Sequence, residues 1–227
     1  MTGLGGCNFR CPYCHNHELV LKPGQLPGRP VEEVIDQLRP VADWLDGVVI
    51  SGGEPTLSQD LDRLCQALQE AGFAVKLDTN GSRPRVLSRL IDKGLLEAVS
   101  MDLKAPLDQP DLHRRLSGVE ADLSAVRHSV DLLLNSQLEV EFRTTVVPGL
   151  LDEDHLRTLC RLVKGAARYK LNAFRPLTCL DQSFTKMAPL TGEEQSRLQE
   201  LDDGWLGLEA EAPQPEIPAP GSGIWSS

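Results

Sequence analysis

Two rhythms of apolar and polar positions follow each other along the chain, and they predict helices and strands in turn. An apolar stripe with three- and four-residue spacing over 31–45 predicts a helix that Pro40 kinks. A short apolar run over 47–51 predicts a strand, and Ser58 caps a second helix that Gly72 ends. The first three predicted elements are therefore a helix, a strand and a second helix.

The same succession continues through most of the chain. Further strands are predicted over 73–78, 97–103, 138–147 and 168–174, with helices over 83–93 and 153–164 and a helical region that reaches about residue 135. Strands that alternate with helices pair in parallel through right-handed crossovers. The sequence therefore predicts an α/β fold with at least five βα units.

The predicted strands are polar on one face. Charged or hydroxyl side chains at 76 and 78, at 102 and 104, and at 141, 143 and 145 alternate with apolar ones. Side chains two residues apart lie on the same face of a strand, and a parallel sheet covered by helices on both faces would be apolar throughout. We therefore expect a barrel or partial barrel, with helices outside and a functional lumen inside.

The end of the chain differs from the rest. Thr191 and Glu194 form a capping box for a last helix that ends near Trp205. Residues 209–227 are rich in Pro, Gly, Glu and Ser, and they cannot bury enough apolar surface to offset their ordering entropy. We expect one folded domain over 1–206 and a disordered tail over 207–227.

Composition narrows the choice of partners. The 227 residues are 41% hydrophobic and carry a net charge of −10, which repels nucleic acid and anionic membranes. No apolar run approaches the roughly 20 residues that cross a bilayer, and the first residues do not form a secretory signal. We expect a cytoplasmic protein with neither a nucleic-acid nor a membrane partner.

Three of the six cysteines lie in one short segment, GCNFRCPYCHN, where Cys7, Cys11 and Cys14 follow the spacing C-x3-C-x2-C. Thiolates are soft ligands, and such spacings let one loop wrap an iron-sulfur cubane and leave one iron open for a substrate. A zinc site completed by His15 or His17 satisfies the spacing as well. The cysteines alone leave both possibilities open.

The remaining cysteines and histidines carry no such pattern. Cys65 and Cys160 fall on apolar helix faces, which predicts core positions, and we expect Cys179 to be a partly buried bystander. The histidines at 113, 128 and 155 show no spacing typical of a metal site, and we assign them no role.

Polar motifs follow the predicted strands. They read SGGEP from residue 51, DTNG from 78, MDLK from 101, FRTTVVPG from 142 and NAFRP from 172. Each alone is ordinary turn chemistry. Five in register at strand ends are typical of the rim where barrel enzymes carry out their chemistry, and Glu54 there is a carboxylate suited to an ammonium group.

Together these segments resemble the radical S-adenosylmethionine enzymes, and most closely the glycyl-radical-enzyme activases of the anaerobic ribonucleoside-triphosphate reductase activating type. The matching words are GCNFRCPYCHN, SGGEP, DTNG, MDLK, FRTTVVPG and FRP, in family order over residues 5 to 176. The resemblance implies a partial (β/α)6 barrel that holds one [4Fe-4S] cluster and S-adenosyl-L-methionine.

The resemblance also implies roles for particular residues. Cys7, Cys11 and Cys14 would hold the cluster, and the methionine part of S-adenosylmethionine would chelate the fourth iron. Tyr13 would lie near the adenine. The methionine amino group would be received by Gly52, Gly53 and Glu54, and the cofactor pocket would be lined by Asp78, Asp102, Lys104 and Arg143.

The implied activity is reductive cleavage of S-adenosylmethionine to a 5'-deoxyadenosyl radical, which takes a hydrogen from a glycine α-carbon of a partner. That partner would be a glycyl radical enzyme, with the large subunit of anaerobic ribonucleotide reductase the first expectation. A flavodoxin- or ferredoxin-type protein would donate the electron. The alternatives are a radical enzyme acting on a small molecule or peptide and, from another class, a non-catalytic zinc-binding module.

One departure from the family concerns the first strand. The family fold begins with a complete strand before the cysteine loop, whereas only six residues precede Cys7. We expect this chain to lack most of that strand, which leaves an exposed sheet edge beside the cluster. We also expect codons upstream of Met1 to encode the missing part, and an immediate in-frame stop codon there would contradict this.

Overall fold

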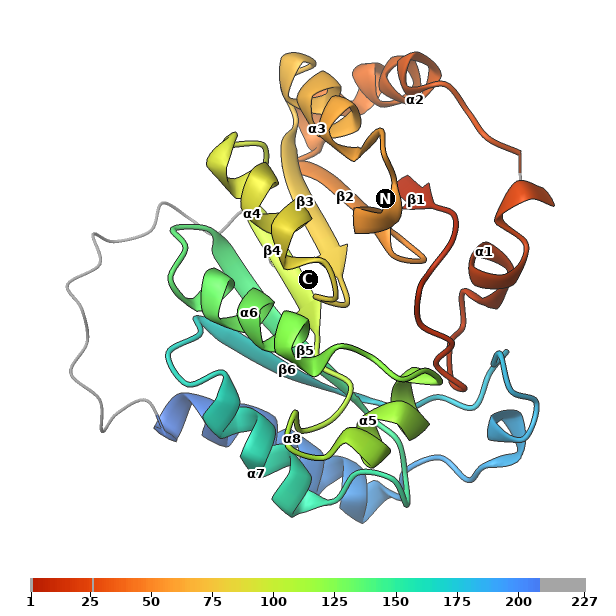
Figure 1. The fold of residues 1–227 in the computed structure, drawn as a ribbon, viewed down its shortest axis with the longest axis vertical. Coiled ribbons are helices and arrows are strands. Elements are labelled where there is room, and N and C mark those ends of the chain that lie inside the picture. Colours follow the sequence, from red (N-terminus) through yellow and green to blue (C-terminus); the bar gives the residue numbers. More distant parts are fainter. Residues whose placement is uncertain (1, 26, 209–227) are drawn as a thin grey trace.

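The computed structural model describes residues 2–25 and 27–208, and within them six strands form one parallel sheet in chain order (Figure 1). The strands are β1 (Thr2–Leu4), β2 (Gly47–Gly52), β3 (Ala74–Thr79), β4 (Ala98–Asp102), β5 (Glu139–Val146) and β6 (Arg168–Ala173). The order β1-β2-β3-β4-β5-β6 does not close on itself, because β1 and β6 are the two edges. The predicted partial barrel is confirmed.

Eight α-helices and four short 3-10 helices occur in the described residues. The α-helices are α1 (His17–Leu21), α2 (Val31–Leu38), α3 (Leu61–Glu70), α4 (Pro84–Asp92), α5 (Pro110–Ser117), α6 (Leu123–Leu134), α7 (Glu153–Leu162) and α8 (Gly192–Leu208). Figure 1 shows α3, α4, α6 and α7 following one another along one side of the curved sheet, with α8 beyond them against β6. None of the described helices is long and apolar enough to cross a membrane.

The alternation along the strands separates a helix-facing core from a polar face. In β3 and β5 every second side chain is buried, including Val75, Leu77 and Phe142, while Asp78 and Arg143 between them are half-buried. Side chains of one strand alternate between the two faces, so the charged residues all point away from the helices. The polar face of the sheet, on the side away from the helices, corresponds to the predicted lumen.

The first strand is short. Residues Thr2–Leu4 form β1 and pair in parallel with β2, Thr2 opposite Ile50 and Leu4 opposite Gly52. Residues before Cys7 therefore supply three strand residues, against the six to eight of most other strands in the sheet. The edge predicted beside the cysteine loop is this three-residue strand.

Several predicted boundaries change in the structure. The helix expected over 31–45 ends at Leu38 and continues as a 3-10 helix, Arg39–Trp44, because Pro40 has no N–H for an α-helical hydrogen bond. The capping box of Thr191 and Glu194 is confirmed, and α8 extends to Leu208, three residues past the expected helix end near Trp205. The tail expected to be disordered lies, from residue 209 on, outside the described residues.

Candidate active site

The three clustered cysteines lie in the irregular segment between β1 and α1, and they share one cavity of about 250 Å³. We call residues 5–16 the cysteine loop. Its backbone N–H groups point at two of the sulfurs: Phe9 donates to Cys7 Sγ at 3.3 Å, and Asn16 donates to Cys14. Donors aimed at sulfur favour anionic thiolates, which is the form that binds a metal.

The cavity shifts the acidity of these thiols. Burial raises the pKa of Cys7 and Cys14 and raises the pKa of Cys11 to about 11, while the positive charge of Lys104 opposes the shift at each. The thiols are therefore protonated near neutral pH when no metal is bound. A bound metal ion supplies the positive charge that favours the thiolates, so loading of this site must release protons.

A network of polar and charged side chains crosses the wall of this cavity. It runs from β2 through β3 and β5 to the end of β4. Arg143 Nε donates to Asp102 Oδ1 at 2.9 Å, and Lys104 Nζ lies 3.3 Å from Asp102 Oδ2. On the other side Arg143 pairs with Asp78 at 3.3 Å, and Ser51 Oγ donates to the same Asp78 oxygen at 3.1 Å. Four predicted pocket residues are thus joined in one network.

The two carboxylates of the network differ in acidity. Burial acts to raise the pKa of Asp102, but Lys104 and Arg143 outweigh it and hold that pKa below its usual value. At Asp78 burial prevails over Arg143 and Ser51, and the pKa is raised. Asp78 Oδ1 is buried and has no hydrogen-bond partner among the described residues. An unpartnered buried acceptor is costly, so this oxygen suits a ligand donor such as an ammonium or hydroxyl group.

Glu54 also lines the cavity, but its carboxylate is already engaged within the protein. Oε1 accepts from Thr56 and Thr79, and Oε2 accepts from Asn80 N at 2.7 Å. The side chain is 1% exposed, and burial raises its pKa against these hydrogen bonds. Its observed contacts thus tie the end of β2 to the turn after β3.

The two glycines before Glu54 sit against backbone. A Cβ at Gly53 would lie 1.9 Å from the carbonyl oxygen of Gly6, and a Cβ at Gly52 would lie 2.4 Å from that of Leu4. Gly53 N donates to Leu4 O, and Glu54 N donates to Gly6 O. The SGGEP motif therefore holds the start of the cysteine loop, because only glycine allows this close approach.

Tyr13 lies elsewhere than the other predicted residues. Its side chain is 7% exposed, its hydroxyl has no partner among the described residues, and it does not line the cavity. Burial raises the pKa of this phenol, and the nearby charge of Lys104 opposes the rise. The position expected for the adenine contact is thus buried and lies outside the set of residues that line the cavity.

The structure adds residues that the sequence analysis passed over. Asn80 Nδ2 lies 4.0 Å from Cys7 Sγ and donates to Asn8 Oδ1 at 3.0 Å, while Asn8 donates to Ser82 Oγ at 2.8 Å. Asn16 donates to Gly52 O at 3.1 Å and also lines the cavity. All three asparagines stand in motifs that the sequence analysis recognised, GCNFRCPYCHN and DTNG, so the signal was present.

The other cysteines and His15 are placed as follows. Cys65 and Cys160 are buried on α3 and α7, which confirms their core positions. Cys179 is 1% exposed, so it is fully rather than partly buried. His15 Nε2 lies 2.9 Å from Arg175 O, which means that this histidine links the cysteine loop to the segment after β6.

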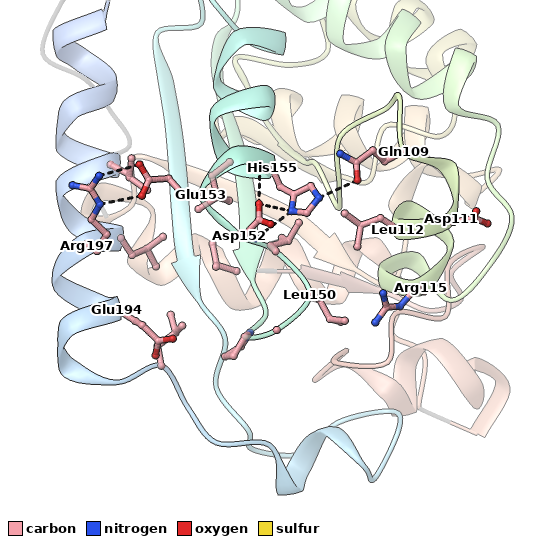
Figure 2. Close-up of a pocket in the computed structure, with 18 of the residues that line it drawn as sticks. Gln109, Asp111, Leu112, Arg115, Leu150, Asp152, Glu153, His155, Glu194 and Arg197 are labelled. Carbon is pink, nitrogen blue, oxygen red and sulfur yellow. Dashed lines mark hydrogen bonds and ion pairs between the residues drawn. The ribbon is translucent and has the colours of Figure 1, made fainter.

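A second and larger cavity of about 960 Å³ lies between α5, α7 and α8 (Figure 2). We call it the helical groove. The end of the FRTTVVPG motif lines it, at Val146, Pro148 and Gly149, whereas Arg143 of the same motif lines the cysteine cavity. Four of the five strand-end motifs therefore contribute to the cysteine cavity, and the fifth, NAFRP, reaches the cysteine loop through Arg175 O.

The residues present fit the cofactors that the resemblance implied. Three thiols in one cavity, with N–H donors at two of the sulfurs, suit a cluster held by three cysteines. Asp78, whose buried Oδ1 has no partner among the described residues, and the cation of Lys104 both line this cavity, and their charges complement the amino and carboxylate groups of a methionine moiety. Burial lowers the pKa of Lys104, but Asp102 raises it more, so this side chain stays charged.

Comparison with known proteins agrees with this site. Residues 1–161 match the model of the radical SAM superfamily. The chain is 34% identical over 201 residues to the Methanocaldococcus jannaschii protein named "Putative glycyl-radical enzyme activating enzyme MJ1227", which covers 86% of this chain and 80% of that protein. It is 29% identical over 184 residues to the pyruvate formate-lyase-activating enzyme of Streptococcus mutans, and the match covers 74% of this chain and 68% of that enzyme.

A solved structure shares the fold. The Streptococcus suis enzyme SuiB bound to S-adenosylmethionine superimposes with a TM-score of 0.71 at 17% identity, over 91% of this chain and 47% of SuiB. This chain thus spans about half the length of that enzyme. The cysteine loop lies within the matched family segment. The protein belongs to the radical SAM superfamily and is an oxidoreductase that uses a [4Fe-4S] cluster and S-adenosylmethionine.

Proposed function

We propose that this protein is an activase, which generates a glycyl radical on a partner enzyme. The relatives named as glycyl-radical enzyme and pyruvate formate-lyase activating enzymes support the proposal, because their matches cover 86% and 74% of this chain. The proposed partner is the large subunit of anaerobic ribonucleotide reductase, since the set of strand-end motifs resembles that activase type. A flavodoxin- or ferredoxin-type protein is the proposed electron donor.

The open sheet supports a macromolecular substrate. Its order β1-β2-β3-β4-β5-β6 leaves β1 and β6 as two separate edges, so the barrel is not closed. An incomplete barrel has an open side that can admit a loop of another protein. A glycine on such a loop needs only its own backbone to reach the site.

In this proposal each residue of the cavity has a defined task. Cys7, Cys11 and Cys14 hold the cluster. Glu54, with the two glycines before it, receives the methionine amino group, and Asp78 lines the pocket. The glycines at 52 and 53 bring backbone close to that group, and Glu54 holds the surrounding turns through its hydrogen bonds. Tyr13 closes the wall behind the adenine.

The buried charges orient the rest of the cofactor. Lys104 and Arg143 keep Asp102 ionised, and together these three fix the lumen wall against which the cofactor lies. When bound, the cluster and S-adenosylmethionine supply a carbon-centred radical, and the protein's part is to orient it and exclude other hydrogen donors. The group on which that chemistry would act is the α-carbon of the partner's glycine.

The test is a reconstitution under anaerobic conditions. Protein loaded with iron and sulfide is reduced and mixed with S-adenosylmethionine and the anaerobic ribonucleotide reductase large subunit. We expect the electron paramagnetic resonance doublet of a glycyl radical on the partner, with 5'-deoxyadenosine formed in equal amount. A partner in which the radical glycine is replaced by alanine is the control, and it should give no doublet.

The outcomes separate the alternatives. Cleavage of S-adenosylmethionine without a doublet on this or another glycyl radical enzyme would contradict the activase proposal and favour a small-molecule or peptide substrate. A doublet on pyruvate formate-lyase alone would contradict only the choice of partner. Stoichiometric zinc without iron-sulfur absorption after reconstitution would favour the zinc-binding module.

A further inference from the structure

The middle of the cysteine loop is supported from outside the sheet by the end of α5. Between Cys7 and Cys11, Arg10 N donates to the carbonyl of Ser117 at 2.7 Å. Ser117 is the last residue of α5 and is fully buried. The backbone of the loop is therefore hydrogen-bonded to a helix terminus at a point between the first two cluster ligands.

The residue after Ser117 makes this approach possible. Gly118 ends α5 in the left-handed conformation, with φ of 71°, and its N–H bonds to Arg114 O. A Cβ added at Gly118 would lie 2.0 Å from the carbonyl oxygen of Arg10 and 2.5 Å from its carbonyl carbon. Those atoms are backbone, so they can yield only if the cysteine loop itself moves.

A side-chain contact supports the same part of the loop. The ring of Phe9 meets the ring of His113 edge to face, with centroids 5.9 Å apart, and both residues are buried. His113 lies one helical turn before Ser117 on α5. Helix α5 thus contacts two consecutive residues of the loop, Phe9 and Arg10.

We propose that the Ser117–Gly118 turn is a positioning element for the cluster ligands. It fixes the span from Cys7 to Cys11, so that both sulfurs face the cavity that Cys14 shares. Any side chain at position 118 pushes Arg10 away from Ser117 and moves the two sulfurs relative to each other. The proposal holds for any partner enzyme, because it concerns cluster loading.

A matched glycine separates this role from ordinary backbone strain. Gly94 follows α4 with φ of 63°, in the same left-handed conformation, but a Cβ there meets nothing within 4 Å. Asparagine tolerates the left-handed region better than most residues while it still carries a Cβ. The test therefore compares Gly118→Asn with Gly94→Asn, and Gly118→Ala with Gly94→Ala.

The main readout is the iron and sulfide content after anaerobic reconstitution. We expect both Gly94 variants to match the wild type, and both Gly118 variants to retain roughly tenfold less cluster, as is usual when supports of metal ligands are lost. Any cluster that remains in the Gly118 variants should give an altered electron paramagnetic resonance spectrum after reduction. Thermal unfolding of the metal-free proteins should give the same midpoint for Gly118→Asn as for Gly94→Asn.

Two results would overturn the proposal. The first is a Gly118→Asn protein with wild-type iron content and spectrum, which would mean that the loop tolerates a Cβ at this turn. The second is a Gly118→Asn protein whose metal-free form unfolds well below Gly94→Asn, because the turn would then matter to the whole fold and not to the loop. Neither result bears on the activase proposal, which is tested on the wild-type protein.

Discussion

The larger of the two cavities has the less unusual electrostatics. The helical groove is about 960 Å³, and its charged residues form ion pairs at the surface, such as Arg197 with Glu153 (Figure 2). The cysteine cavity is about 250 Å³, yet it gathers three raised thiol pKa values, a four-member charge network and an unpartnered carboxylate oxygen. Perturbed buried groups therefore mark the site here, and volume does not.

The electrostatics explain the difference. In the cysteine cavity Arg143 is 22% exposed and must balance two carboxylates in a region with little water. In the helical groove Arg197 is 54% exposed, and water screens its pairs with Glu153 and Glu200. An arginine is thus expected to stabilise the fold strongly in the cysteine cavity and weakly in the helical groove. Matched substitutions of the two arginines can measure this difference.

The largest effect is expected from removing a cluster ligand. Cys11→Ala leaves only two of the three proposed cluster ligands, so reconstituted protein should bind little iron. Cleavage of S-adenosylmethionine should then fall by a factor on the order of 10³ or more. Cys160→Ala, on α7 near the helical groove, is the control and should keep both. Iron analysis and 5'-deoxyadenosine production measure the outcome, and cleavage that survived in Cys11→Ala would refute the cluster assignment.

The next effect concerns the charge network. Arg143→Met leaves Asp78 and Asp102 without their shared cation, and we expect a loss of about 2 to 3 kcal/mol in the free energy of unfolding. The substitution should also weaken binding of S-adenosylmethionine, because Asp102 then keeps only its ion pair with Lys104 and the link to Asp78 is lost. Urea denaturation of the metal-free protein at pH 7 measures the first change, and an unaltered midpoint would show that the network does not stabilise the fold.

A third effect is a pH dependence set by His113 on α5. Burial, together with the charge of Lys104, lowers the pKa of His113 from 6.5 to about 4. Below pH 6.5 the unfolded chain binds a proton that the folded chain does not, so stability should fall between pH 6.5 and 4, by on the order of 2 kcal/mol. Above pH 6.5 this residue adds no slope, because both states are neutral.

The pH effect can be assigned by substitution. His113→Leu removes the titrating ring, so its stability should decline less than that of the wild type over the same range. His128→Gln, at an exposed position on α6, should keep the wild-type decline. Denaturant titrations of the metal-free proteins between pH 4 and 7 provide the data, and parallel curves for wild type and His113→Leu would count against the assignment.

The smallest effect is expected in the helical groove. Arg197→Met removes ion pairs with Glu153 and Glu200 at the surface, so the urea midpoint should fall only slightly, and this difference should vanish in 1 M salt, where the screening length is about 3 Å. Urea denaturation at low and high salt measures this. A loss equal to that of Arg143→Met would erase the contrast between the two cavities.

The local pattern of the sequence was enough for the fold and for much of the site. Strand and helix periodicities placed the elements of the barrel, and the alternation of Lys76 and Asp78 with Val75 and Leu77 placed the polar face. The spacing of the three cysteines marked the ligand loop. These features are local, because each depends on residues within a few positions of one another.

What the tertiary structure decided depends on contacts between distant segments. The SGGEP motif predicts Glu54 as a ligand contact, and its hydrogen-bond partners Thr79 and Asn80 come from the end of β3 and the turn after it. The hydrogen bond from Arg10 N to Ser117 O joins two distant segments, and their own sequences predict only a loop and a helix end. Local sequence fixes which groups a segment offers, whereas the partners of those groups are set only when folding brings the segments together.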